Sequence, residues 1–392
     1  MATLLLVVIY LSFISLGVPD SLLGTAWPVL YRELGVPLAS QSAVSILCSL
    51  ATMTSSMNSA RIISHLGTGK VTAFSTLLTA ALLGFSFSGS FWFMCLMAIP
   101  LGLGAGCVDS ALNNYVSIHY NATVMSFLHC FYGVGVMVSP YIMSVVINSA
   151  VGWRGGYRTA SLIQALIGSI LLLALPLWKK AHGEESIQAE KKMKVLPISQ
   201  TLRIPGALMT CLLFLTFCAI EVICGGWSAT YMVEAKHMSA NLAARATMYF
   251  YLGMALGRFL SGVAAKKLTP WQIIFISMGI LGVSQTTLLV SGNNVLTMAA
   301  LLMTGLGVGP LYPNFNYMTP LHFGKDVSQS VMGMQMTFAS IGTIAAPALC
   351  GVLGQLLGMG IFPAYLMIFY VLTAVGIIAL RRTLRQVGRL QQ

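Results

Sequence analysis

Charged side chains are scarce in this sequence. Asp, Glu, Lys and Arg make up 8% of the 392 residues, whereas soluble domains carry about 25%. So few charges cannot cover the surface of a water-soluble globule, and 57% of the residues are hydrophobic. The scarcity excludes an ordinary soluble enzyme or binding module, and it predicts a protein surrounded mainly by lipid.

The motifs of catalysis and of metal or nucleotide binding are also missing. The sequence has no nucleophile elbow, HExxH or P-loop motif, and its eight cysteines form no CxxC pair. We therefore expect no enzyme activity, no cofactor and no metal site. The net charge of +12 does not indicate nucleic-acid binding, because the basic residues lie between apolar segments rather than on one folded face.

Long apolar segments are what the sequence has in abundance. A membrane-spanning helix needs about 20 apolar residues. Such segments cover residues 4–31, 42–63, 71–87, 92–116, 124–147, 157–178, 204–232, 243–264, 271–290, 295–318, 327–357 and 361–380. The pattern predicts an all-α integral membrane protein with 12 transmembrane helices.

The basic residues predict the orientation of these helices. With a cytoplasmic N-terminus, most Lys and Arg residues fall on the inside, Arg258 included. Those left outside are Arg32, Arg154, Arg158, Lys236 and Arg245. This positive-inside bias predicts that both termini are cytoplasmic. We expect a multi-pass protein of the plasma membrane, specifically of a bacterial inner membrane.

The chain repeats itself at about half its length. An offset of 202 residues aligns Gly24 with Gly226, and an offset of 203 lays residues 102–114 over residues 305–317. Repeats of this length are typical of two six-helix halves related by an axis along the membrane normal. We predict one half over residues 1–178, a cytoplasmic linker over 179–203 and a second half over 204–392.

Three of the nine acidic residues lie near the middle of predicted helices. They are Asp20, Asp109 and Glu221. An ionised side chain there costs about 2.5–3.5 kcal/mol, which implies a water-lined cavity or proton binding. We predict proton coupling through these acids, with burial against a neighbouring helix as the alternative. His129 is either a proton relay beside them or a packing group.

Polar and aromatic residues share faces with two of these acids. Helical spacing puts Asp20 and Trp27 on one face and Asp109 and Asn113 on another. An acid, an amide and an indole suit a hydroxylated ligand, because the polar groups bond hydroxyls while the ring covers the apolar side of a sugar. Trp27 can equally belong to the interfacial aromatic belt.

The repeat makes the two halves unequal. An offset of 203 aligns Asn113 with Asn316 but Asp109 with Tyr312, so this acid exists only in the first half. We therefore predict that the first half titrates and that the second half supplies neutral substrate contacts. The candidates for these contacts are Trp227, Tyr312, Asn314, Asn316 and Gln335.

Several short motifs carry a family resemblance. They are the basic loop at residues 61–70, Gly17-Val-Pro19-Asp20, residues 104–113, residues 128–135, and Glu221 followed by Gly226-Trp227. Together they resemble the major facilitator superfamily, and within it the fucose permease and sugar:proton symporter group. The resemblance implies that Asp20 and Asp109 handle substrate and protons. In the basic loop, Ser64 and His65 stand where the superfamily signature has Asp and Arg.

These observations together favour a secondary active transporter. We expect proton-coupled symport of a sugar or other small polar solute, by alternating access, in a protein that acts as a monomer in the lipid bilayer. The alternatives are an exporter or uniporter of another small metabolite, and a non-transporting membrane receptor on the same scaffold.

Overall fold

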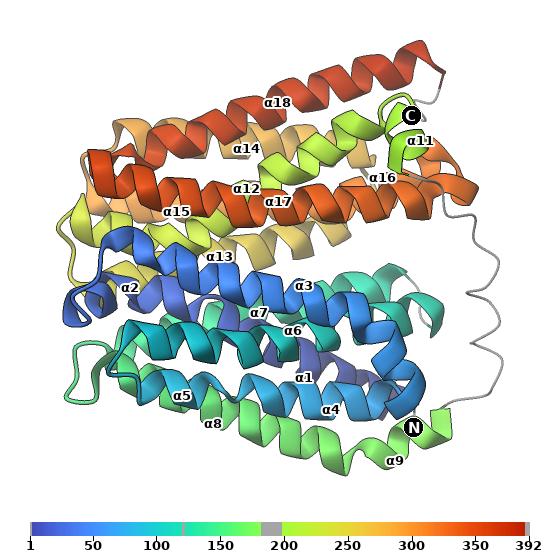
Figure 1. The fold of residues 1–392 in the computed structure, drawn as a ribbon. Helices are drawn as coiled ribbons and strands as arrows, with labels where there is room; N and C mark the ends of the chain where they lie inside the picture. The colour runs from blue at the N-terminus through green and yellow to red at the C-terminus, as the bar shows by residue number, and fades with distance from the viewer. Residues whose placement is uncertain (1, 120–121, 182–197, 389–392) are drawn as a thin grey trace.

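The computed structural model describes residues 2–119, 122–181 and 198–388. Regular secondary structure in these residues is entirely helical. Figure 1 shows the helices in two bundles that lie side by side, one built from α1 to α9 and the other from α11 to α18. The predicted linker lies largely in residues 182–197, outside the described residues.

The first bundle follows the predicted apolar segments closely. Its elements are α1 (Ala2–Asp20), α2 (Leu22–Glu33), η1 (Leu38–Ser40), α3 (Gln41–Leu66), α4 (Thr68–Thr79), α5 (Leu82–Ser86), α6 (Phe91–His119), α7 (Ala122–Val146), α8 (Gly152–Leu173) and α9 (Leu175–Ala181).

The second bundle repeats this order. Its elements are α11 (Ile198–Arg203), α12 (Ala207–Glu234), α13 (Ala240–Ala264), α14 (Pro270–Val290), α15 (Asn294–Val308), α16 (Leu311–Phe323), α17 (Lys325–Leu357), η3 (Met359–Ile361) and α18 (Phe362–Gln386). The start of α14 is set by a capping box, in which Thr269 and Gln272 satisfy each other's backbone N–H groups.

Ten helical segments of the described chain are long and apolar enough to cross a membrane. The prediction of an all-α, multi-pass membrane protein is confirmed at this level. Two long helices, α3 and α13, are not among the ten. Both carry many polar residues for a membrane helix, and both have faces turned toward the space between the bundles.

Three predicted spans are broken near their centres. The span predicted at residues 71–87 divides at Ala80 and Ala81 into α4 and α5, among apolar residues, whereas the other two divide beside candidate site residues. The span predicted at residues 4–31 divides at Ser21 into α1 and α2, directly after Asp20. The span predicted at residues 295–318 divides at Gly309 and Pro310 into α15 and α16, directly before Tyr312. Membrane proteins tolerate such breaks where the backbone lines a cavity or is buried in protein. The breaks beside Asp20 and Tyr312 therefore indicate where a polar site lies.

The two bundles meet closely at one end. Helix α2 packs on α12, α3 on α17, and α7 on α13. A Cβ atom on Gly24 would lie 2.5 Å from the Gly225 carbonyl oxygen, so only glycine permits this approach of α2 to α12. Figure 1 shows both chain termini at the opposite end of the molecule.

Polar side chains also join the bundles at this end, which we call the rim. Arg32 pairs with Glu234 at 2.7 Å, and the Tyr31 hydroxyl donates to the same carboxylate at 2.8 Å. Gln41 donates to the Gly226 carbonyl at 2.9 Å. Arg32 and Glu234 are 202 residues apart, the offset that also aligns Gly24 with Gly226. The rim thus lies where equivalent positions of the two repeats meet.

Candidate functional site

A cavity of about 550 Å³ lies between the two bundles. Helices of both bundles line it, chiefly α1, α3, α6 and α7 on one side and α12, α13, α16 and α17 on the other. All four residues predicted for proton coupling are in its lining: Asp20, Asp109, Glu221 and His129.

Asp20 stands at the break between α1 and α2. Its side chain is exposed to the cavity, and its Oδ2 atom accepts a hydrogen bond of 2.6 Å from the Tyr132 hydroxyl of α7. The sequence analysis did not select Tyr132. Tyr132 lies three residues after His129, so both are on one face of α7. This spacing could have identified Tyr132 from the sequence.

Asp109 and His129 approach the cavity from α6 and α7. Both are partly buried. The His129 ring lies 5.8 Å from the Phe13 ring and 6.2 Å from the Tyr312 ring, so it bridges the first bundle to α16 of the second. The Asn113 side chain, predicted to share the face of Asp109, lies outside the described part of the structure.

Glu221 is paired rather than isolated. The Arg258 guanidinium of α13 lies 3.3 Å from one Glu221 oxygen and 3.4 Å from the other, and both side chains are largely buried at the cavity wall. The placement of Arg258 among the cytoplasmic basic residues was wrong. The second half therefore contributes an ion pair to the cavity and not only neutral groups.

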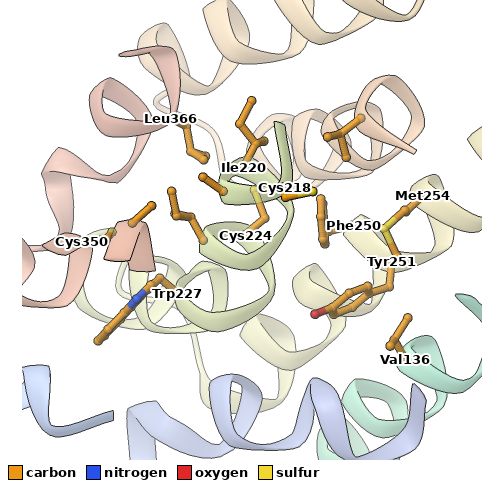
Figure 2. Packing of buried hydrophobic residues seen from close by; sticks show 14 of the residues in the cluster. Val136, Cys218, Ile220, Cys224, Trp227, Phe250, Tyr251, Met254, Cys350 and Leu366 are labelled. Carbon is orange, nitrogen blue, oxygen red and sulfur yellow. The ribbon is translucent and has the colours of Figure 1, made fainter. Parts of the chain in front are cut away.

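Two predicted substrate contacts of the second half line the cavity. The Trp227 indole N–H donates to the Pro347 carbonyl at 2.8 Å, which fixes the ring against α17. Figure 2 shows Trp227 of α12 near Cys350, and Tyr251 of α13 near Val136 of the first bundle. The Tyr312 hydroxyl lies 3.3 Å from the Met336 sulfur and neighbours the Asn316 amide. Asn316 itself is partly buried and outside the lining.

Three other predicted contacts are buried away from the cavity. Trp27 is fully buried, and its N–H donates to the Leu38 carbonyl at 2.8 Å. It is therefore neither a cavity wall nor part of an interfacial belt. Asn314 donates to Ser261 and to the Pro310 carbonyl, and Gln335 bonds Thr210 and Thr319. These side chains tie helices together within one bundle, which helical spacing alone could not distinguish from lining a cavity.

The sequence analysis also missed the polar face of α3. Gln41, Ser42, Ser45, Ser49 and Thr52 all line the cavity. Their spacing of three and four residues puts them on one face of the helix. The same serines and threonine lower the hydropathy of the segment. The unusual polarity of this predicted membrane helix could therefore have indicated a cavity-lining face.

Comparison with known proteins identifies the family. A model of the Major Facilitator Superfamily matches residues 9–246 and 209–389, which together cover nearly the whole chain. The chain belongs to this superfamily.

One protein of similar sequence and one solved structure of similar fold can be compared with this member of the Major Facilitator Superfamily. It is 22% identical over 386 residues to Bypass of stop codon protein 6 of Saccharomyces cerevisiae, covering 90% of this chain and 77% of the yeast protein. Its fold matches a bacterial homologue of the human lysosomal transporter Spinster, solved in an inward-facing and occupied conformation. That match has a TM-score of 0.74 at 10% identity and covers 100% and 98% of the two chains. The predicted membership of the superfamily is confirmed, and the fucose permease subgroup stays a prediction.

Proposed function

We propose that this protein is a secondary active transporter that carries a sugar or another small polar solute together with protons. The observation that supports this most is the cavity between the bundles, which collects Asp20, Asp109 and the Glu221–Arg258 pair in a chain with only nine acidic residues. Placing carboxylates within a membrane protein is costly, and they usually mark substrate or proton pathways. Aromatic rings in the same wall suit the apolar face of a sugar.

The transport cycle in this proposal is alternating access. The two halves are residues 1–178 and 204–392, joined by a linker at 179–203, and they rock about the central cavity. The rim contacts between Arg32 and Glu234 and between Gly24 and Gly225 support a state closed at that end. The cycle would break these contacts and close the opposite end.

The proposed topology has twelve spans. Helices α3 and α13 would add to the ten apolar spans, because each has a length of 25 residues or more and turns polar residues toward the cavity rather than toward lipid. Both termini would then be cytoplasmic, as the distribution of Lys and Arg predicts. We propose a monomer in the plasma membrane, and a bacterial inner membrane stays a prediction.

Asp20 and Asp109 are the proposed proton carriers. Asp20 faces the cavity and has a neutral partner in Tyr132, so it can bind and release a proton without breaking an ion pair. Glu221 is held by Arg258 in the same half, so its charge is compensated throughout a rigid-body motion of that half. We therefore assign Glu221 to fixing Arg258 and leave proton exchange to the two aspartates, with His129 as a relay.

A reconstituted transport assay tests this function. Purified protein in liposomes is screened for counterflow of labelled sugars, amino acids and drugs, with and without a pH gradient. We expect uptake of a sugar that a proton gradient drives uphill. Asp20→Asn and Asp109→Asn should each abolish accumulation, while Glu33→Gln, an acid at the rim outside the cavity, should keep it.

Other outcomes point to the alternatives. If both aspartate variants accumulate sugar as the wild type does, proton coupling through these residues is wrong. Exchange that ignores the pH gradient indicates a uniporter. No uptake of any candidate by correctly folded protein favours a receptor on the same scaffold.

A further inference from the structure

The face of α3 that points into the cavity carries a row of uncharged polar groups. Gln41, Ser42, Ser45 and Ser49 follow one another at spacings of one, three and four residues, and all four line the cavity. Beside this row the helix packs on α6 so closely that a Cβ atom on Gly102 would lie 2.2 Å from the Cys48 carbonyl oxygen. This tight contact fixes the rotation of α3 and keeps the row facing inward.

The side-chain oxygen atoms of this row lack hydrogen-bond partners in the described part of the structure. In the described part of the structure, the Gln41 Oε1 and Ser42 Oγ atoms are buried without a hydrogen-bond partner, and no side-chain hydrogen bond involves Ser45 or Ser49. Thr52, one turn further on, differs because it bonds the Cys48 and Gly102 carbonyls. Buried polar groups in proteins are normally satisfied, so the two unsatisfied atoms of Gln41 and Ser42 and the unpaired hydroxyls of Ser45 and Ser49 leave this wall able to bond a solute or cavity water.

The chemistry of Gln41 limits what that ligand presents. Its Nε2 atom donates to the Gly226 carbonyl at 2.9 Å, and a carbonyl can only accept, so the amide orientation is fixed. The free Oε1 atom is then an acceptor on a side chain that is 4% exposed. A carboxylate or phosphate would be repelled there. A hydroxyl or an N–H group of a solute would be accepted.

An aromatic ring borders the same wall. A Cβ atom on Gly351 would lie 2.4 Å from the Trp227 ring and 3.0 Å from the Ser42 hydroxyl, so both groups converge on the backbone of α17 at this glycine. The hydroxyl row of the first half therefore meets the edge of the Trp227 ring of the second half, which lines the cavity and is 1% exposed. An alcohol-rich ring has the matching pair of surfaces, hydroxyl groups on its edge and C–H bonds on its face.

We infer that Gln41, Ser42, Ser45 and Ser49 form the wall that recognises the hydroxyl groups of a neutral polyhydroxylated solute, with Gln41 selecting a hydrogen-bond donor at the closed end. This inference rests on the proposed transport function and names the part of the cavity that sets its specificity. The carboxylates of Asp20 and Asp109 then serve proton coupling. The polar face of α3 discriminates between polyols and other solutes.

Direct binding to the purified full-length protein tests the wall. The probes are tritiated D-glucose, L-fucose and myo-inositol, measured in detergent without a proton gradient. Losing hydrogen bonds should raise the Kd by about tenfold in Gln41→Leu and in the double variant Ser45→Ala/Ser49→Ala. Thr54→Val is the matched control, because Thr54 is exposed on the same helix, outside the lining, and bonds the Leu50 carbonyl of its own helix.

The outcomes separate this inference from the proposed function. Variants that bind within about twofold of a sugar-binding wild type would overturn the hydroxyl wall and leave the transporter proposal intact. Wild-type protein that binds a probe but cannot accumulate it with protons would overturn the coupling and leave the wall intact. If the wild type binds none of the three probes, the hydroxyl wall is overturned, and the counterflow screen with amino acids and other solutes decides the transporter proposal. The serine double variant removes only two hydroxyl groups, so it carries the test if Gln41→Leu does not fold.

Discussion

At the scale of single residues, the ion pair between Glu221 and Arg258 changes the charge of the cavity wall, because Arg258 compensates one of its three carboxylates. Neither residue could be paired from the sequence, because Arg258 lies on a different helix and its position near the end of a predicted span resembles that of a cytoplasmic anchor. A lone carboxylate in the membrane suggests a proton site, whereas a compensated one suggests a fixed structural charge.

We predict that Arg258→Leu lowers the free energy of unfolding by about 3 kcal/mol, since it leaves the Glu221 carboxylate largely buried without its partner. The double variant Arg258→Leu/Glu221→Leu should recover most of this loss. Thermal unfolding in detergent measures both. Arg245→Leu is the matched control, an exposed arginine on the same helix that should change little. A double variant no more stable than Arg258→Leu would contradict the pairing.

At the scale of helices, the approach of α2 to α12 depends on glycine. The repeat aligned Gly24 with Gly226 in sequence, and the structure brings these two positions into contact across the interface. The alignment predicted that Gly24 and Gly226 occupy equivalent places in the two halves. They can touch only if the axis that relates the two halves passes close to both. Sequence offset alone does not locate that axis.

Adding one methyl group at this contact should be costly. Gly24→Ala places a Cβ atom 2.5 Å from the Gly225 carbonyl oxygen, so α2 and α12 must separate, and we expect a loss of about 1–3 kcal/mol in thermal unfolding. Gly262→Ala in α13 is the control, because nothing lies within 4 Å of its added Cβ atom. Equal unfolding midpoints for the two variants would show that the close approach does not matter.

At the scale of the whole molecule, charges at the rim hold the two halves together on one side. Arg32 and Glu234 come from different halves, whereas the neighbouring pair of Glu33 and Arg154 lies within the first half. Both pairs are partly exposed, so each contributes little to stability. Only the pair of Arg32 and Glu234 must break when the halves separate at the rim. This pair therefore affects the balance between the closed and the open state of the rim.

We predict that Arg32→Glu shifts this balance toward an open rim by about two- to fivefold, as expected for a partly exposed ion pair. Faster amide hydrogen exchange at residues 34–40, followed by mass spectrometry, would report the opening. The charge swap Arg32→Glu/Glu234→Arg should restore slow exchange. Glu33→Gln, which breaks the pair within one half, should leave exchange near wild type, and a change as large as that of Arg32→Glu would contradict the assignment.

Composition and hydropathy were enough to predict the class of the molecule and the position of its acids along the membrane helices. Hydropathy and the repeat near half-length predicted an all-helical membrane protein in two halves, because lipid tolerates few structures and long apolar segments are unmistakable. The Major Facilitator Superfamily was predicted from the resemblance of short motifs, and the family model confirms it. The energetics of lipid also predicted a water-lined cavity or proton binding at Asp20, Asp109 and Glu221, since an isolated charge in lipid is too costly. The structure places all three in the lining of one cavity.

The neighbour that each polar side chain contacts depends on how the helices pack, which the sequence does not reveal. Helical periodicity tells which residues share a face, but it does not tell whether that face meets a cavity, another helix or lipid. For this reason Trp27 and Gln335 proved to be buried within their own bundles, and Arg258 proved to be the partner of Glu221. The polar face of α3 could not be recognised as a cavity wall for the same reason. Only the packing of the helices shows that its serines face the cavity.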